Sequence, residues 1–181
     1  ETVMAPTREL AVQIYNDAEL LSKHSGLSLG LIYGGEGYES QRDQLTKGVD
    51  IVIGTTGRII DYYKQDIFSL KNIQVAVLDE ADRMLDMGFI PDVRRIVDLL
   101  PRIRQTLFFS ATFTEQIRRL IDQWTHEPVE VTIEPETVAT DNIDQKFFMV
   151  AGDEKFDVLC KYLREEKIER AIIFANRRDI T

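Results

Sequence analysis

Cysteine and histidine are scarce in this chain of 181 residues, which contains one cysteine and two histidines. A single cysteine excludes an internal disulfide framework and is typical of a protein from a reducing compartment. His24 and His126 have no cysteine or second histidine at ligand spacing, which argues against a zinc site. The sequence shows neither an apolar run long enough to span a bilayer nor the pattern of a signal peptide. We therefore expect a soluble, cytoplasmic protein.

Basic residues are outnumbered, since 22 lysines and arginines stand against 31 acidic residues and give a net charge of -9. Proteins that bind nucleic acid usually neutralise phosphates with clustered basic side chains, so the composition argues against such a ligand. Backbone amides, helix N-termini and a few arginines can nevertheless contact phosphates. The charge therefore predicts weak binding of nucleic acid rather than none.

A phosphate-binding loop of the form G-x-x-x-x-G-K-[ST] is also missing from the sequence. The single lysine beside a glycine, in Lys47-Gly48, has the reverse order and no glycine four to six residues before it. This motif therefore gives no nucleotide site.

Strand and helix patterns alternate along the chain, which favours βαβ units and a parallel sheet. Apolar residues recur every three or four positions in the helical segments, as in the stripe of Leu10, Ile14, Ala18 and Leu21. Thr112 and Glu115 have the spacing of a capping box before a later helix. The strand patterns of the first part of the chain lie at 2–5, 28–33, 50–53, 74–78, 106–109 and 129–133.

An acidic segment without a basic residue, 134–144, interrupts this periodicity and predicts an extended linker. After it, strand patterns at 147–150 and 170–174 flank a helical pattern at 153–166. We therefore predict a first domain at 1–133, a linker at 134–144 and the beginning of a second α/β domain at 145–181.

Five short motifs each begin where a predicted strand ends. The carboxyl ends of parallel strands lie at one edge of a sheet, where α/β proteins bind their ligands, so we expect the motifs to converge on one site. The motifs are Pro6-Thr7-Arg8-Glu9-Leu10, Gly34-Gly35, Thr55-Thr56-Gly57-Arg58, Asp79-Glu80-Ala81-Asp82 and Ser110-Ala111-Thr112.

The most informative motif follows an apolar strand pattern and places the carboxylates of Asp79, Glu80 and Asp82 within four residues. Together with the hydroxyls of Ser110 and Thr112, these acids suit a bound metal ion and a phosphoryl transfer. The structural alternative is that an Asp-Glu pair after a strand forms a solvated turn and that the hydroxyls cap a helix.

A second group of residues combines hydroxyls, glycines and arginines without acids. Glycines allow close approach of the backbone, and helix N-termini point free N–H groups at an anion, so a row of nucleic-acid phosphates fits this group. Taken singly, each has a structural alternative, a turn for the glycine pair and a surface charge for the last arginine. The group comprises Thr7, Arg8, Gly34, Gly35, Thr55, Gly57 and Arg58.

In this order, the five motifs resemble those of the DEAD-box family of ATP-dependent RNA helicases, and the resemblance covers essentially the whole chain. It implies a RecA-like parallel sheet flanked by helices, followed by the start of a second RecA-like domain. It also implies that ATP and Mg²⁺ bind here and that RNA is held by its sugar-phosphate backbone, independently of base sequence.

The resemblance further implies a role for each residue. Asp79 and Glu80 would bind the nucleotide, with Asp79 holding Mg²⁺ through water and Glu80 activating the water that attacks the γ-phosphate. Asp82 would hydrogen-bond Ser110 and Thr112 and so link nucleotide to RNA. The RNA contacts would come from Pro6, Thr7, Arg8, Gly34, Gly35, Thr55, Gly57 and Arg58.

Two features depart from the family pattern. Thr56 stands where proline is usual, and because threonine can adopt the same backbone angle, we expect weaker rigidity with function intact. The phosphate loop and the late arginine motifs are missing, so we expect a fragment of a helicase that does not hydrolyse ATP by itself.

Two other functions compete with this interpretation. A degenerate helicase could act as a nucleotide-independent RNA-binding or partner-docking module, although such a module has no use for the Asp79-Glu80 pair. An unrelated doubly wound domain with an acidic metal site, such as a phosphatase, leaves the arginine and glycine motifs unexplained.

Overall fold

The computed structural model describes residues 1–35, 37–133, 144, 146–152 and 154–174. It divides into two compact units, Glu1–Glu130 and Val131–Thr181. Nearly all of the predicted linker, 134–144, lies outside the described residues, so its predicted extended form stays a prediction. None of the described helices is long and apolar enough to cross a membrane.

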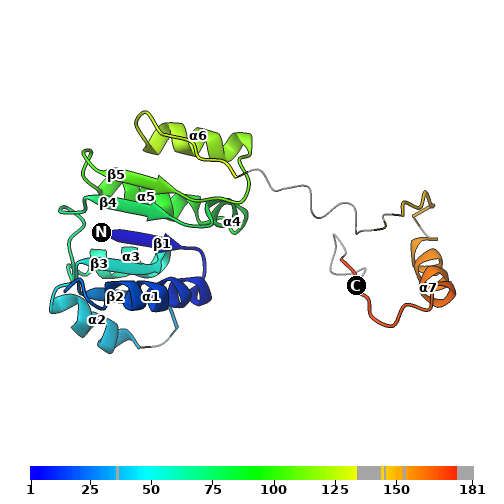
Figure 1. Cartoon of the computed structure of the whole chain (residues 1–181), viewed down its shortest axis with the longest axis horizontal. Helices are drawn as coiled ribbons and strands as arrows, with labels where there is room; N and C mark the ends of the chain where they lie inside the picture. The colour runs from blue at the N-terminus through cyan, green and yellow to red at the C-terminus, as the bar shows by residue number, and fades with distance from the viewer. Residues whose placement is uncertain (36, 134–143, 145, 153, 175–181) are drawn as a thin grey trace. The chain divides into compact units, whose positions relative to one another are not determined.

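The first unit contains a five-stranded sheet with the strand order β2-β3-β1-β4-β5, in which every neighbouring pair is parallel (Figure 1). The predicted parallel sheet is therefore confirmed, and five of its strands lie within two residues of their predicted bounds. The strands are β1 Thr2–Ala5, β2 Leu29–Ile32, β3 Ile51–Thr55, β4 Val75–Leu78 and β5 Gln105–Phe108.

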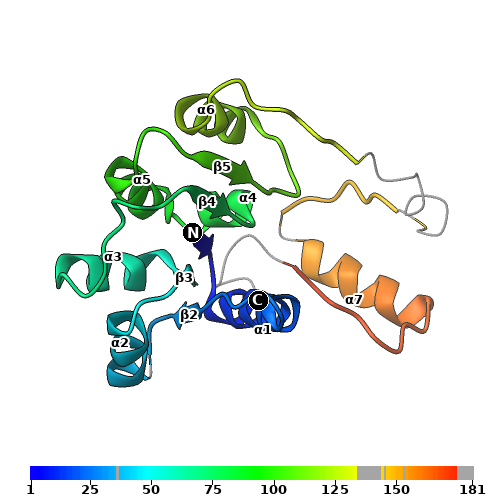
Figure 2. The ribbon, with the colours of Figure 1, turned by 60° about the vertical axis from the view of Figure 1, so that its left-hand side comes forward.

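Helices cover both faces of this sheet, because successive strand side chains point to opposite sides. Met4 and Val52 belong to a large apolar cluster with α3, α5 and α6, whereas Ala5 and Ile53 pack with α1 on the other face. Figure 2 shows α3 and α5 on the opposite side of the sheet from α1. The helices are α1 Arg8–Ser22, α2 Tyr38–Thr46, α3 Thr56–Lys64, α4 Ala81–Asp86, α5 Ile90–Leu99 and α6 Glu115–Trp124.

Two details of the predicted helices are wrong. Leu21 is 85% exposed, because the described packing of α1 on its cluster ends at Ala18. The capping box fails because α6 is capped by Thr114, whose Oγ1 accepts a hydrogen bond from the Ile117 backbone N–H at 3.3 Å. Thr112 is instead bonded to an acidic side chain of α4.

The predicted strands at 129–133, 147–150 and 170–174 are also wrong, since all three segments are irregular. A strand requires a neighbour that accepts and donates its backbone hydrogen bonds, and among the described residues none pairs with these segments. In the second unit the helix predicted at 153–166 is confirmed as α7, Lys155–Glu165.

Candidate functional site

The parallel topology brings all five motifs to the carboxyl edge of the sheet. Pro6 follows β1, Asp79 follows β4 and Thr55 is the last residue of β3. Gly34 lies two residues after the end of β2, and Ser110 lies two residues after the end of β5. The expected convergence on one edge is therefore confirmed.

The acidic motif is fixed by backbone hydrogen bonds to the strands on either side. The Asp79 N–H donates to the Met4 carbonyl of β1 at 3.1 Å, and the Ala81 N–H donates to the Phe109 carbonyl beyond β5 at 3.0 Å. Glu80 between them has φ 49° and ψ 52°, a left-handed conformation that costs a residue with a side chain about 1 kcal/mol or more. The surrounding contacts hold the turn in this strained form.

The three carboxylates of this motif have three separate partners rather than forming one cluster. Asp79 Oδ1 accepts a hydrogen bond from the Glu80 N–H at 2.9 Å, and Glu80 Oε2 lies 3.1 Å from Arg83 Nη1. Asp82 Oδ2 accepts hydrogen bonds from both the N–H and the hydroxyl of Thr112, each at 3.0 Å. Accordingly, no group of three or more acidic, histidine or cysteine side chains gathers into a metal site within the described part of the chain.

The pKa values of the two aspartates are shifted in opposite directions. Burial raises the pKa of Asp79, and the nearby Glu80 charge adds to this, while the Glu80 N–H opposes it. Burial also acts to raise the pKa of Asp82, but hydrogen bonds from the Thr112 hydroxyl and from the N–H groups of Arg83 and Thr112 lower that pKa below its ordinary value. Asp82 is therefore stabilised as an anion, whereas Asp79 is not.

Ser110 completes the connection between α4 and the segment after β5. Its hydroxyl donates to the Thr112 carbonyl at 2.8 Å, and Thr112 in turn donates to Asp82. The structure thus brings Asp82, Ser110 and Thr112 into one set of contacts between two neighbouring strand ends.

The first arginine motif lies beside the glycine pair. Thr7 caps α1, its Oγ1 accepting a hydrogen bond from the Leu10 N–H at 3.3 Å. The Arg8 guanidinium carbon lies 4.6 Å from the centre of the Tyr33 ring, just before the glycines. A Cβ placed on Gly35 would be 3.8 Å from Arg8 Nη1, so these two motifs are adjacent.

The second arginine motif opens α3. Gly57 is exposed, and a Cβ added to it would meet no other described atom within 4 Å, so its surface is open to a ligand. The Arg58 side chain is only 13% exposed and lies over the rings of Tyr38 and Tyr62. The simple alternative for Arg58, a surface charge on a helix, is therefore wrong.

Sequence reasoning missed the three tyrosines that contact these arginines. Tyr62 stands four residues after Arg58, and this spacing, which puts both side chains on one helix face, could have indicated their contact. Tyr33 and Tyr38 are distant in sequence from the arginines they contact, and no local pattern indicates those contacts.

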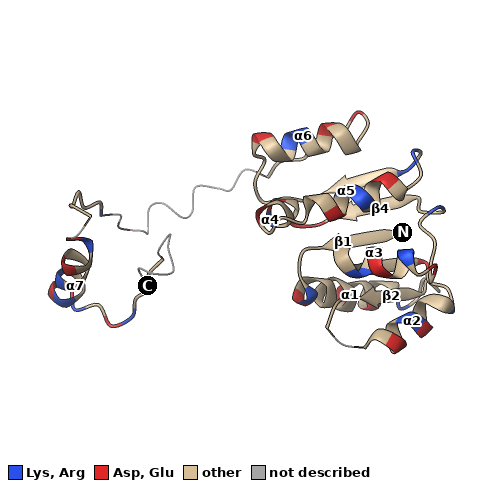
Figure 3. Cartoon of the chain, turned by 180° about the vertical axis from the view of Figure 1, so that it is seen from behind, with Lys and Arg blue, Asp and Glu red and all other residues tan. Residues whose placement is uncertain are grey.

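Figure 3 shows that basic and acidic residues are interspersed along the helices of this unit.

The family model for DEAD/DEAH box helicases matches residues 2–120. The chain belongs to this family. It is 56% identical to the ATP-dependent RNA helicase RhlB of Pseudoalteromonas atlantica over 96% of its own length and 42% of the relative. It is 51% identical to the protein of the same name from Shewanella amazonensis, over 96% of this chain and 40% of that relative. This member of the DEAD/DEAH box family therefore spans about two fifths of the length of these relatives.

Solved structures agree with this assignment. A DEAD box protein from the hyperthermophile Methanococcus jannaschii has a TM-score of 0.70 and 36% identity over 91% of this chain and 44% of its own. The yeast DEAD-box splicing factor Prp28 has a TM-score of 0.65 and 32% identity over 69% of this chain and 30% of its own. The predicted RecA-like fold of the DEAD-box family is confirmed.

Proposed function

We propose that this chain is part of an ATP-dependent RNA helicase that couples ATP hydrolysis to RNA binding and local duplex unwinding. The observation that carries the proposal is the shared carboxyl edge, where Asp79 and Glu80 lie on the same side of the sheet as Arg8, Gly57 and the glycine pair. The relatives named RhlB are ATP-dependent RNA helicases, which supports both ligands.

The donor set at the turn fits Mg²⁺. This ion prefers oxygen ligands, retains several waters and is usually bound by one or two carboxylates together with substrate phosphates. The half-buried Asp79 carboxylate would hold the ion through one of these waters. When bound, Mg²⁺ would offset charge on the phosphate oxygens of ATP.

Glu80 would accept a proton from the attacking water. Its side chain is 39% exposed, and its contact with Arg83 is a surface ion pair of a kind worth about 0 to 1 kcal/mol. So weak a contact can be exchanged for a water molecule at low cost. Glu80 can therefore turn from Arg83 to the nucleotide.

Asp82 is the link between the two ligands in this proposal. Its two hydrogen bonds to Thr112 span the ends of β4 and β5, so a movement of the acidic turn displaces the segment after β5. The RNA backbone would contact Pro6, Thr7, Arg8, Gly34, Gly35, Thr55, Gly57 and Arg58.

The predicted division of the chain remains part of the proposal. Residues 1–133 would form most of the first RecA-like domain, 134–144 the linker and 145–181 the start of the second domain. The boundary between the two compact units, after Glu130, supports this division. The single cysteine supports a cytoplasmic protein.

The test is Glu80→Gln in the complete gene product. Loss of a general base typically costs 10² to 10⁴ in rate, so we expect RNA-stimulated ATP hydrolysis to fall by about that factor while RNA affinity is unchanged. Glu115→Gln, in the exposed first turn of α6, is the matched control and should leave hydrolysis intact.

Two results would contradict the proposal. Full hydrolysis by Glu80→Gln would remove Glu80 from the reaction. RNA binding without any hydrolysis by the unaltered protein would favour the nucleotide-independent binding module instead.

A further inference from the structure

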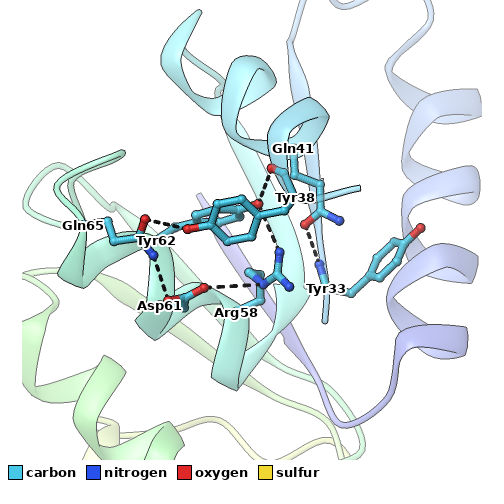
Figure 4. A network of polar contacts seen from close by, with 7 residues as sticks. All are labelled: Tyr33, Tyr38, Gln41, Arg58, Asp61, Tyr62 and Gln65. Atoms are coloured by element: carbon cyan, nitrogen blue, oxygen red, sulfur yellow. Dashed lines mark hydrogen bonds and ion pairs between the residues drawn. The ribbon is translucent and has the colours of Figure 1, made fainter. Parts of the chain in front are cut away.

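A closed set of side-chain contacts joins α2 to α3 beside the second arginine motif (Figure 4). Arg58, Asp61 and Tyr62 lie at intervals of three and one residues on one face of α3, and Gln65, the C-cap of this helix, follows three residues later. The fifth is Tyr38, the first residue of α2.

Arg58 is held from several sides. Its guanidinium carbon lies 4.9 Å from the centre of the Tyr38 ring and 5.2 Å from that of Tyr62. Nη1 donates to the Tyr62 hydroxyl at 3.2 Å, and Nε lies 3.7 Å from Asp61 Oδ2. Stacking on aromatic faces is a strong preference of the planar guanidinium group.

Tyr38 joins the set through both its side-chain hydroxyl and its backbone carbonyl. Its hydroxyl donates to Gln65 Oε1, and Gln65 Nε2 donates to Asp61 Oδ1 at 2.8 Å. Its carbonyl accepts a hydrogen bond of 2.7 Å from the fully buried Tyr62. The two rings lie 5.1 Å apart, within the range of favourable aromatic pairs.

These contacts connect two of the proposed RNA motifs. Tyr38 stands three residues after Gly35, and Arg58 directly follows Gly57. The two segments extend from β2 and β3, which are neighbours in the sheet. The contacts between Tyr38 and Arg58 therefore join the first residue of α2 to the start of α3.

We propose that Tyr38 is a positioning residue for RNA binding, which holds the Arg58 guanidinium against α3 with its remaining exposed part toward an RNA phosphate. This inference rests on the proposed function. A free arginine side chain loses rotamer entropy when it is fixed, and an arginine already held by Tyr38 and Tyr62 avoids much of that loss on binding.

The test compares Tyr38→Leu with Tyr38→Phe in the complete gene product, using a single-stranded RNA at several salt concentrations. Leucine removes the ring over Arg58, so we expect affinity about five- to tenfold weaker, in line with cation–π and preorganisation effects. Loss of one phosphate contact should also reduce the slope of log affinity against log salt by about 0.7. Phenylalanine keeps the ring and should keep both the affinity and the slope.

Tyr63→Leu is the matched control, because Tyr63 is a partly buried tyrosine of α3, the helix that carries Arg58, and packs on the core. A merely structural role for Tyr38 predicts that both leucine variants lower the melting temperature and leave the salt slope unchanged. That result, or unaltered affinity in Tyr38→Leu, would overturn the inference.

The Arg58 Nε–H signal in a ¹⁵N spectrum provides a readout that does not involve RNA. We expect a ring-shifted signal in the unaltered protein and in Tyr38→Phe, and a smaller shift in Tyr38→Leu, where only the Tyr62 ring remains beside Arg58. If the unaltered protein binds no RNA, the proposed function fails and the inference fails with it. If it binds RNA equally well with and without the Tyr38 ring, only the inference fails.

Discussion

At the scale of single residues, the acidic turn holds two aspartates whose pKa values are shifted in opposite directions from the ordinary 3.8. Burial raises the pKa of Asp79, so folding favours its protonated form and the stabilisation is lost as the pH rises through the raised folded value. The lowered pKa of Asp82 means that its anion stabilises the fold above pH 3.8, and this stabilisation is lost as the pH falls through the folded value.

The first prediction uses these signs. Asp79→Asn should raise the melting temperature at neutral pH, and the gain should vanish below pH 3.8, where the wild-type carboxyl is protonated. Asp82→Ala should lower the melting temperature at neutral pH, and its deficit should shrink in acid. Thermal melts over a pH series check both.

Asp86→Ala serves as the control, because Asp86 is an exposed acid at the end of the same helix. Parallel pH profiles for Asp82→Ala and Asp86→Ala would show that the contacts of Asp82 with Thr112 contribute no specific stability. A loss of stability in Asp79→Asn at neutral pH would show that its hydrogen bond to the Glu80 N–H outweighs the effect of burial.

The positions of the candidate site residues could be predicted from the sequence, whereas their contacts could not. Strand ends and a parallel sheet suffice to gather Asp79, Arg8 and Thr55 at one edge. The partner of Asp82 came from the family resemblance, and the covering of Arg58 by Tyr38 depends on how two helices pack. No spacing along the chain encodes that packing.

At the scale of elements, the approach of β2 to β3 requires glycine at position 54. A Cβ on Gly54 would lie 2.4 Å from the carbonyl oxygen of Ile32 and 2.5 Å from its Cγ1. Backbone atoms cannot move aside without separating the strands, so we expect Gly54→Ala to lower the free energy of unfolding by about 1 to 3 kcal/mol or more. Chemical denaturation measures this change.

Gly30→Ala in the neighbouring strand provides the comparison. Its Cβ would approach the two γ-methyl groups of Val49 at 3.2 and 3.3 Å, and a side chain can adjust where a carbonyl cannot. We expect the smaller loss for Gly30→Ala. Equal losses would mean that β2 and β3 can separate easily, which would contradict a rigid edge for the Thr55 motif.

Element prediction succeeded where each strand has a neighbour in the sheet. The pattern at 50–53 is borne out because β3 pairs with β1 and β2. The segments 129–133 and 170–174 have the same apolar character, but their structure is irregular. An apolar pattern indicates that a segment can be buried and does not show whether a partner strand is available.

At the scale of the whole molecule, the net charge of -9 limits how RNA can be bound. The net charge gives no long-range attraction to phosphates, so on the proposed function the affinity would come from contacts at the sheet edge. Among the motif residues only Arg8 and Arg58 carry positive charge. On the proposed function, about two phosphates would therefore be neutralised, with backbone N–H groups and glycines supplying the other contacts.

This count predicts an unusually weak dependence of RNA affinity on salt. With about 0.7 released counterions per neutralised phosphate of a single strand, the slope of log affinity against log salt should be about -1.4, so a fourfold rise in salt weakens binding only about sevenfold. Titration of the 181-residue chain with a labelled single-stranded RNA measures the slope. Arg8→Gln should reduce its magnitude by about 0.7, whereas Arg95→Gln, an exposed arginine of α5, should not change it. A much steeper slope would mean that basic side chains outside the five motifs bind the RNA.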